Sequence, residues 1–199
     1  GEAIYPTPTV AVVGLLDDRS HHTTQWFKND EDLVGLVGFT MEELGGSEYL
    51  NVVHGRAEGQ PPHLDLQIAQ SVSKLCLTLI LESLIVSAHD CSEGGLAIAL
   101  AESCISHPQM PKGAVLDIES TIRNDACLFG ESQSRILVSF LEKNRLVIEK
   151  KAEALGVPFT VIGKVGGDSF IVNVNGKEFI SDEISHLKQL WLGALETYV

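Results

Sequence analysis

The strongest constraint on the fold is that segments with helical periodicity alternate with short apolar runs. One helix is expected from Leu64 to Ile80, and further helices at 92–104, 124–129, 142–155 and from Ser181 onward. The intervening runs at 33–37, 84–90, 114–118, 135–140, 159–165 and 169–174 have the length and composition of strands. A helix with one apolar face must bury that face, and a sheet is the surface available. We therefore predict an α+β fold (mixed α/β) in which helices flank a mixed β-sheet.

Several polar residues mark where these elements begin and end. Ser47 and Ser92 each precede a predicted helix and are expected to be its N-cap. Asn175-Gly176 is the strongest turn signal, because both central positions of a tight hairpin turn favour positive φ. Ser181 is expected to start the last helix.

The first 32 residues differ in character from the rest. Tyr5 to Pro8 form a proline-restrained, extended connector, and the apolar run 9–16 is predicted to be a buried strand. Residues 17–32 are polar and charged, which is typical of an interdomain linker. The chain starts with Gly in the middle of this pattern, so we expect it to be a piece of a longer protein.

The charge of the chain disfavours nucleic-acid and membrane partners. Lys plus Arg total 14 and Asp plus Glu total 27, for a net charge of −13. The sequence contains neither a signal peptide nor an apolar run long enough to span a membrane. The cysteines lie too far apart for a zinc site and are expected to be free thiols, so we expect no metal ligands and a cytoplasmic location.

The segment Ser87-Ala88-His89-Asp90-Cys91-Ser92-Glu93-Gly94-Gly95 carries the most chemical information. A strand ends and a helix opens on two glycines, which aims free backbone N–H groups at one point and suits an anion such as phosphate. Asp90 is placed to orient His89 or to help bind a metal-bound phosphate. The structural alternative is that Ser92 caps the helix, Asp90 satisfies the turn, and Gly94 and Gly95 permit tight packing. A Cys91–His89 catalytic pair is disfavoured, since it has no orienting partner beyond Asp90.

A second polar segment precedes the strand at 135–140. Gly130 frees the chain to turn, and Glu131, Ser132 and Gln133 then stand at the entry of the strand, where they suit a sugar, phosphate or amide ligand. A polar edge that caps the preceding helix explains the same residues equally well. The glycine-rich run 163–167 contains a lysine but lacks the spacing and the following helix of a phosphate loop, so it is expected to be a strand break.

These segments, in this order, resemble the C-terminal half of the synthetase portion of phosphoribosylformylglycinamidine synthase (formylglycinamide ribonucleotide amidotransferase). The matching pieces span nearly the whole chain: YPTPTVAVVGLLDD, LGGSEYL, SAHDCSEGGLAIALAE, LFGESQSRILVSF and VIGKVGG. The HD-x-S-x-GG pattern alone resembles the wider aminoimidazole ribonucleotide synthetase superfamily. The additional segments LGGSEYL and FGESQ narrow the resemblance to the amidotransferase. Cys91 departs from the pattern, where a small aliphatic residue is more usual.

The resemblance implies a fold like the C-terminal domain of aminoimidazole ribonucleotide synthetase and a role in purine biosynthesis. The family enzyme uses ATP, Mg²⁺ and glutamine-derived ammonia to convert formylglycinamide ribonucleotide to its amidine. By this resemblance, residues 1–17 end a preceding N-terminal-type domain, 18–32 form a linker, and 33–199 form the C-terminal synthetase-like domain. The partners implied are the remaining synthetase domains and a glutaminase domain or subunit.

The resemblance also implies a set of site residues, none of them catalytic. Glu131, Ser132 and Gln133 match a motif that contacts substrate in the other half of such enzymes, and His89, Asp90, Ser92, Gly94 and Gly95 match the HD-x-S-x-GG motif. We expect these residues to border a substrate or nucleotide site and the chain to be inactive alone. The alternatives are a non-catalytic structural module, or a domain of another superfamily member such as a selenophosphate synthetase or small-molecule kinase. Without its preceding domain, the apolar run from Val10 to Leu16 is expected to be exposed and to favour self-association.

Overall fold

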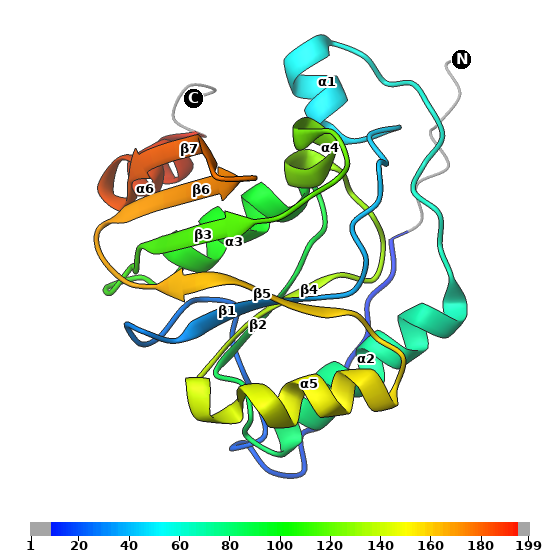
Figure 1. Cartoon of the computed structure of the whole chain (residues 1–199), viewed down its shortest axis with the longest axis vertical. Helices are drawn as coiled ribbons and strands as arrows, with labels where there is room; N and C mark the ends of the chain where they lie inside the picture. Colours follow the sequence, from blue (N-terminus) through cyan, green and yellow to red (C-terminus); the bar gives the residue numbers. More distant parts are fainter. Residues whose placement is uncertain (1–8, 195–199) are drawn as a thin grey trace.

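A seven-stranded mixed sheet forms the centre of the protein, whose computed structural model describes residues 9–194 (Figure 1). The strands lie in the order β2-β4-β1-β5-β3-β6-β7. β3 and β6 pair in parallel, and every other neighbouring pair is antiparallel. The bounds are β1 Leu33–Val37, β2 Ser87–Asp90, β3 Ala114–Ile118, β4 Ile136–Phe140, β5 Phe159–Val165, β6 Ser169–Val174 and β7 Lys177–Glu183.

Helices cover both faces of this sheet (Figure 1). On one face α3 (Gly95–Ile105), α4 (Asn124–Phe129) and α6 (Ile184–Gly193) share a hydrophobic core with the sheet. On the other face α2 (Leu66–Leu81) and α5 (Arg145–Ala154) form a second core, and a short 3-10 helix, Glu142–Asn144, leads into α5. The helix α1 (Glu48–His54) buries no side chain and lies beside α4, where Tyr49 stacks on Phe129. The predicted fold, a mixed sheet flanked by helices, is confirmed.

Local signals placed most of these elements correctly. The Ser47 hydroxyl accepts the N–H of Leu50 and caps α1. In α2 the residues that face the sheet, Val72, Leu75 and Leu79, follow the predicted helical spacing. Asn175 and Gly176 both have positive φ, at 52° and 73°, and connect β6 to β7. These features depend on neighbours in sequence, which is why the sequence predicts them.

Two predicted helix starts are wrong. Ser92 does not cap α3, because the N-cap is Gly94 and its φ of 77° brings the chain into the helix two residues later. Ser181 does not begin a helix, because it lies inside β7, where it pairs with Ile171 of β6. The hairpin ladder continues to Glu183, and α6 begins only at Ile184. In the second case the pairing of β7 with β6 decides the element boundary.

The predicted buried strand at 9–16 is also wrong. These residues have no regular structure, and Val13 and Leu15 are 95% and 98% exposed. A buried strand needs a neighbour to supply hydrogen bonds and cover, and no other described residue does so here. The apolar run is exposed, as expected for a chain without its preceding domain. The predicted connector at Tyr5 to Pro8 lies outside the described residues.

The second half of the predicted linker packs against the domain. Thr24 forms a parallel bridge with Ser87 at the edge of β2, and the N–H of Phe27 donates to the carbonyl of Ser103 at 2.9 Å. Phe27 itself is buried in the α3 core. The described residues before Thr23 are mostly exposed, so any boundary of the folded unit falls close to that point. Within residues 9–194, none of the helices has the length and apolar character that crossing a membrane requires.

Candidate functional site

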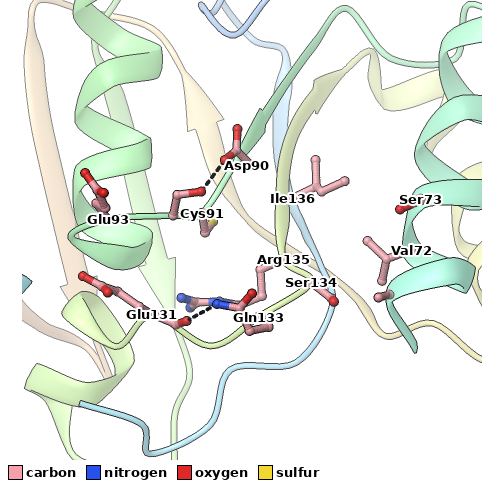
Figure 2. Close-up of a pocket in the computed structure, with 12 residues that line it drawn as sticks. Val72, Ser73, Asp90, Cys91, Glu93, Glu131, Gln133, Ser134, Arg135 and Ile136 are labelled. Carbon is pink, nitrogen blue, oxygen red and sulfur yellow. Dashed lines mark hydrogen bonds between the residues drawn. The ribbon is translucent and has the colours of Figure 1, made fainter. Parts of the chain in front are cut away.

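A polar pocket of about 410 Å³ lies where β2 ends and α3 begins. Figure 2 shows Asp90 and Glu93 on one side of it, Val72 and Ser73 of α2 across from them, and Glu131, Gln133 and Ser134 from the turn before β4. The two predicted motifs therefore meet at one pocket although about 40 residues separate them in the sequence. Of the eight predicted site residues, four line this pocket: Asp90, Ser92, Glu131 and Gln133.

Asp90 and Ser92 are exposed polar groups of the first motif. The Ser92 hydroxyl donates to Oδ2 of Asp90, and this hydrogen bond lowers the pKa of the Asp90 carboxyl below its ordinary value. The other oxygen, Oδ1, lies 3.5 Å from Nδ1 of His89, and the Asp90 side chain as a whole is 72% exposed and so accessible to a ligand. The pair therefore offers an ionised acceptor at the mouth of the pocket.

His89 does not line the pocket. Successive side chains on a strand point to opposite faces, and His89 lies on the face covered by α3, where its Nε2 is 2.7 Å from Oε2 of Glu102. Its neighbour Cys91 is buried, and burial raises the pKa of that thiol to about 11. Burial and the raised pKa both oppose formation of the thiolate that a Cys91–His89 catalytic pair would need.

The two glycines serve packing and hydrogen bonding within the domain. A Cβ on Gly95 would lie 2.5 Å from the carbonyl oxygen of Gly130, so the start of α3 contacts the end of α4 backbone to backbone. The N–H of Gly94 donates to Oε1 of Glu131 at 2.8 Å. The helix terminus predicted to attract an external anion is thus already occupied by a carboxylate of the same chain.

Glu131 links two helix N-termini. The oxygen that accepts from Gly94 also accepts the N–H of Glu48, the first residue of α1, at 2.9 Å. Both amides belong to the unsatisfied groups at the start of a helix, where a negative charge is favourable. Glu131 is therefore a structural link between α1 and α3 as well as part of the pocket wall.

Ser132 and Gln133 have opposite environments. Ser132 is buried, and its hydroxyl accepts the N–H of Met41 at 3.1 Å and donates to the Met41 carbonyl at 3.3 Å. It therefore joins the turn before β4 to the loop after β1. Gln133 is exposed, with its amide 3.3 Å from the Glu131 carbonyl, and it projects at the pocket (Figure 2). Within this motif, Gln133 has the side chain that is most free to meet a ligand.

Arg135 organises this region, and sequence reasoning did not select it as a site residue. Only 2% of it is exposed, and its guanidinium donates to the carbonyls of Ser132 and Gly130 at 3.0 and 2.5 Å and to the hydroxyl of Thr40 at 3.3 Å. Burial lowers the pKa of Arg135. The sequence offered one signal for this role, namely a cation at the start of an otherwise apolar strand. A charge buried at that position requires several hydrogen-bond acceptors around it.

An apolar pocket adjoins the polar one. It has a volume of about 370 Å³, and its wall includes Phe39, Met41 and Ile68. Gln133 and Ser134 line both pockets and so form the boundary between them. Phe39 and Met41 are 51% and 50% exposed, which is unusual for large apolar side chains unless a ligand or partner covers them.

The residues of this region do not fit a metal site of their own. Although Asp90, Glu93 and Glu131 all line the polar pocket, Glu131 binds two amides and Asp90 accepts from Ser92. Across residues 9–194 no group of three His, Cys, Asp or Glu side chains is arranged to hold an ion. A Mg²⁺ ion requires several oxygen ligands at short range, and this arrangement does not provide them.

The sequence is similar to one group of curated proteins. The phosphoribosylformylglycinamidine synthase subunit PurL of Alkaliphilus metalliredigens is 38% identical over 194 residues, which is 98% of this chain and 26% of the relative. The same subunit of Moorella thermoacetica is 42% identical over 189 residues, which is 95% of this chain and 25% of the relative. The chain thus spans about a quarter of the length of the curated relatives it matches.

Solved structures show the same fold. PurL of Thermotoga maritima complexed with FGAR superposes with a TM-score of 0.74 at 16% identity, covering 85% of this chain and 30% of that one. The complex of the same protein with ATP gives a TM-score of 0.68 at 16% identity, covering 85% and 28%.

A family model for the C-terminal domain of AIR synthase related proteins matches residues 29–175. This range begins just before β1 and ends at the turn after β6, so it contains both motifs and the pocket between them. The chain therefore belongs to the family of AIR synthase related proteins, of which it carries the C-terminal domain.

Proposed function

We propose that this chain is the C-terminal domain of the synthetase portion of phosphoribosylformylglycinamidine synthase. That enzyme is an ATP-dependent carbon–nitrogen ligase of purine biosynthesis, in which ammonia from glutamine converts formylglycinamide ribonucleotide to its amidine. The observation that carries the proposal is the match of nearly the whole chain to relatives of that name at about 40% identity. The pocket between the two motifs supports it, because it is the place where this domain would meet a ligand.

In this proposal the chain supplies one wall of a site and no catalytic group. The accessible groups of the pocket include the carboxylates of Asp90 and Glu93 and the amide of Gln133, and burial raises the pKa of its one thiol, Cys91. These groups would bind and orient a ligand, but the transfer of a phosphoryl group also needs cations that neutralise the phosphates. We expect those cations to come from other domains of the longer protein, so the isolated chain is inactive.

Nucleotide binding by the longer protein is part of the proposal. The Thermotoga maritima structures of the same fold were solved with ATP, ADP and AMPPCP. ATP would supply the phosphoryl group that activates the substrate amide. In this chain Asp90, Ser92 and Gln133 are the groups placed to contact a nucleotide or substrate, and any Mg²⁺ would be held mainly by the phosphates and by other domains.

The surroundings of the domain follow from the same proposal. We infer that residues 1–17 belong to a preceding domain that covers the exposed apolar run at 9–16. Residues 18–32 would connect it to the unit at 33–199, with the part of this segment from Thr23 onward packed on that unit. The further partners would be the other synthetase domains and a glutaminase, in the cytoplasm. A structure of Thermotoga maritima named PurLQS is among those with this fold.

A second candidate is that the chain is a purely structural module, and the hydrogen bonds of the second motif favour it. Glu131, Ser132 and Arg135 all form hydrogen bonds within the domain. A motif that only stabilises a turn would look the same. The two functions differ at Gln133, which makes a single long hydrogen bond and projects at the pocket. A selenophosphate synthetase or small-molecule kinase has no such observation in its favour.

Calorimetric titration of the purified chain with MgATP, MgADP and formylglycinamide ribonucleotide tests the proposal. We expect binding of at least one ligand that Gln133→Ala weakens, while Gln189→Ala on the exposed face of α6 leaves it unchanged. If no ligand binds, or if both variants bind as the parent does, the structural module is the correct interpretation.

Sedimentation velocity on the same sample tests self-association, which a Val13→Ser, Leu15→Ser variant should abolish.

A further inference from the structure

We propose that the polar and apolar pockets together hold a ribonucleoside by its uncharged end, with the base in the apolar pocket and the sugar hydroxyls in the polar one. The phosphates then point away from this domain. This inference rests on the proposed nucleotide-binding role and adds to it the orientation of the ligand.

The charges around the polar pocket argue against a phosphate in it. Asp90, Glu93 and Glu131 line it, and the one cation in its wall is Arg135, which is buried and donates to two carbonyls and a hydroxyl. No Lys and no second Arg lines either pocket among the described residues. A polyphosphate would therefore approach three carboxylates with little compensation, and at such short range salt screens the repulsion only partly.

The helix N-terminus beside the pocket is already bonded within the domain. A helix N-terminus is the usual neutral site for a phosphate, but at α3 the Gly94 N–H already donates to Glu131 at 2.8 Å. The same carboxylate accepts from Glu48 at the start of α1. A phosphate would have to displace an anion that two helix termini stabilise. Hydroxyl groups face no such competition, because they donate to the carboxylates that are already there.

The apolar pocket fits a planar ring. The half-exposed side chains of Phe39 and Met41 form its wall together with Ile68, and an aromatic or thioether group gains from contact with the face of a base. Glu43 also lines this pocket, and its Oε2 is a buried acceptor without a hydrogen-bond partner among residues 9–194. An amino group on the base edge would supply the missing donor after a small movement of that side chain.

The shared wall sets the geometry of the ligand. Gln133 and Ser134 line both pockets, so a ligand that fills both must pass over them at the junction of its two parts. In a ribonucleoside that junction is the bond between base and sugar. The Gln133 amide can donate and accept at this point, whereas free ribose or a free base would fill one pocket only.

Equilibrium dialysis of the full 199-residue chain against labelled adenosine, ATP, ribose and tripolyphosphate tests this orientation. We expect adenosine to bind within about threefold of ATP, since the phosphates add no attraction at this domain. Tripolyphosphate should neither bind nor displace ATP, and ribose alone should bind far more weakly than adenosine. Phe39→Ala should weaken adenosine binding about tenfold by removing a stacking surface, whereas Phe179→Ala, at an exposed phenylalanine of β7, should not.

The outcomes separate this inference from the proposed function. If ATP binds, tripolyphosphate displaces it and adenosine does not bind, the orientation is overturned while the nucleotide-binding role stands. If adenosine binds equally to the parent and to Phe39→Ala, the base is not in the apolar pocket and the inference is overturned. If none of the probes binds, the inference fails together with nucleotide binding by this domain.

Discussion

The two motifs that border the pocket use their polar residues in opposite ways. In the segment 89–95 the side chains of Asp90 and Ser92 lie at the pocket, while the glycines provide hydrogen bonding and close packing beneath them. In the segment 130–135 the polar side chains bond mainly within the domain, and Gln133 alone remains exposed. The first motif therefore presents two side chains, Asp90 and Ser92, to the pocket from a tightly packed backbone. The second motif presents only Gln133, which is held in place by buried, hydrogen-bonded neighbours.

This difference teaches that polarity in a motif does not identify the residues that meet a ligand. Glu131, Ser132 and Gln133 are adjacent and equally polar, yet they are half-buried, buried and exposed, respectively. What separates them is the partner that each finds in a distant part of the chain. Substitutions at the internally bonded positions should therefore alter stability, and substitutions at the exposed ones should alter binding.

The largest effect is expected at Arg135. Arg135→Ala leaves the carbonyls of Gly130 and Ser132 without their donor and opens a cavity, so the free energy of unfolding should fall by about 3–4 kcal/mol. Urea denaturation followed by circular dichroism measures it. Arg145→Ala removes only an exposed ion pair with Glu149 and should have a far smaller effect on the free energy of unfolding. Equal losses in the two variants would show that Arg135 does not organise the turn.

Gly95 should come second. Its φ is +68°, and a Cβ would lie 2.5 Å from the Gly130 oxygen, so Gly95→Ala should lower the free energy of unfolding by about 2–3 kcal/mol. Gly176 has a similar φ of +73° but open space around it, so Gly176→Ala should cost only about 1 kcal/mol. Thermal or urea denaturation of the pair isolates the contact between α3 and α4. Equal losses of unfolding free energy in the two variants would show that the contact between α3 and α4 does not contribute to stability.

Glu131 tests the link between the two helix termini. Glu131→Ala removes an acceptor for two N–H groups and should cost about 1–2 kcal/mol, while Glu131→Gln keeps an acceptor and should lose less than half of that. Hydrogen exchange should show faster exchange of the Glu48 and Gly94 amides in the alanine variant. Glu93→Ala, an exposed carboxylate of the same pocket, provides the control. Unchanged exchange at both amides would contradict the link.

The smallest effect concerns the pH dependence of Asp90. Its folded-state pKa lies below the ordinary value of 3.8 because Ser92 donates to it. The hydrogen bond therefore adds stability above about pH 4, and this contribution disappears as the pH falls through the lowered pKa. Since the side chain is largely exposed, the effect should be a fraction of a kcal/mol. The difference in unfolding free energy between the parent and Ser92→Ala should shrink from pH 6 to pH 3; a constant difference would show that the bond does not form.

Much of the fold was predictable because its signals are local. The spacing of Val72, Leu75 and Leu79 identified the buried face of α2, and the Asn175-Gly176 turn fixed the hairpin of β6 and β7. Ser47 and Ser92 show the limit of such signals, since the same residue type caps α1 but lies outside α3. The difference is that Gly94 has a left-handed backbone conformation, and the Gly95 contact with Gly130 that accompanies it is not visible in the sequence.

The candidate site was predictable in part. Both motifs were identified, and four of their residues line one pocket. The sequence did not reveal that His89 pairs with Glu102 on the α3 face, or that Arg135 is the buried centre of the turn. These outcomes depend on contacts between residues far apart in the chain. The adjoining apolar pocket was also missed, because Phe39 and Met41 follow β1 and belong to neither motif.

The position of β1 has a consequence for how the chain acquires its structure. Among the described residues β1 is the earliest strand in the chain, yet it lies inside the sheet between β4 and β5, and these partners follow about 100 and 125 residues later. Until those residues have left the ribosome, the run Leu-Val-Gly-Leu-Val has no ladder to join, so the topology has a high contact order and folding is expected to be slow. Exposure of this run during synthesis is therefore an aggregation hazard, and the charged residues Asp30, Glu31 and Asp32 directly before the run are placed to oppose it.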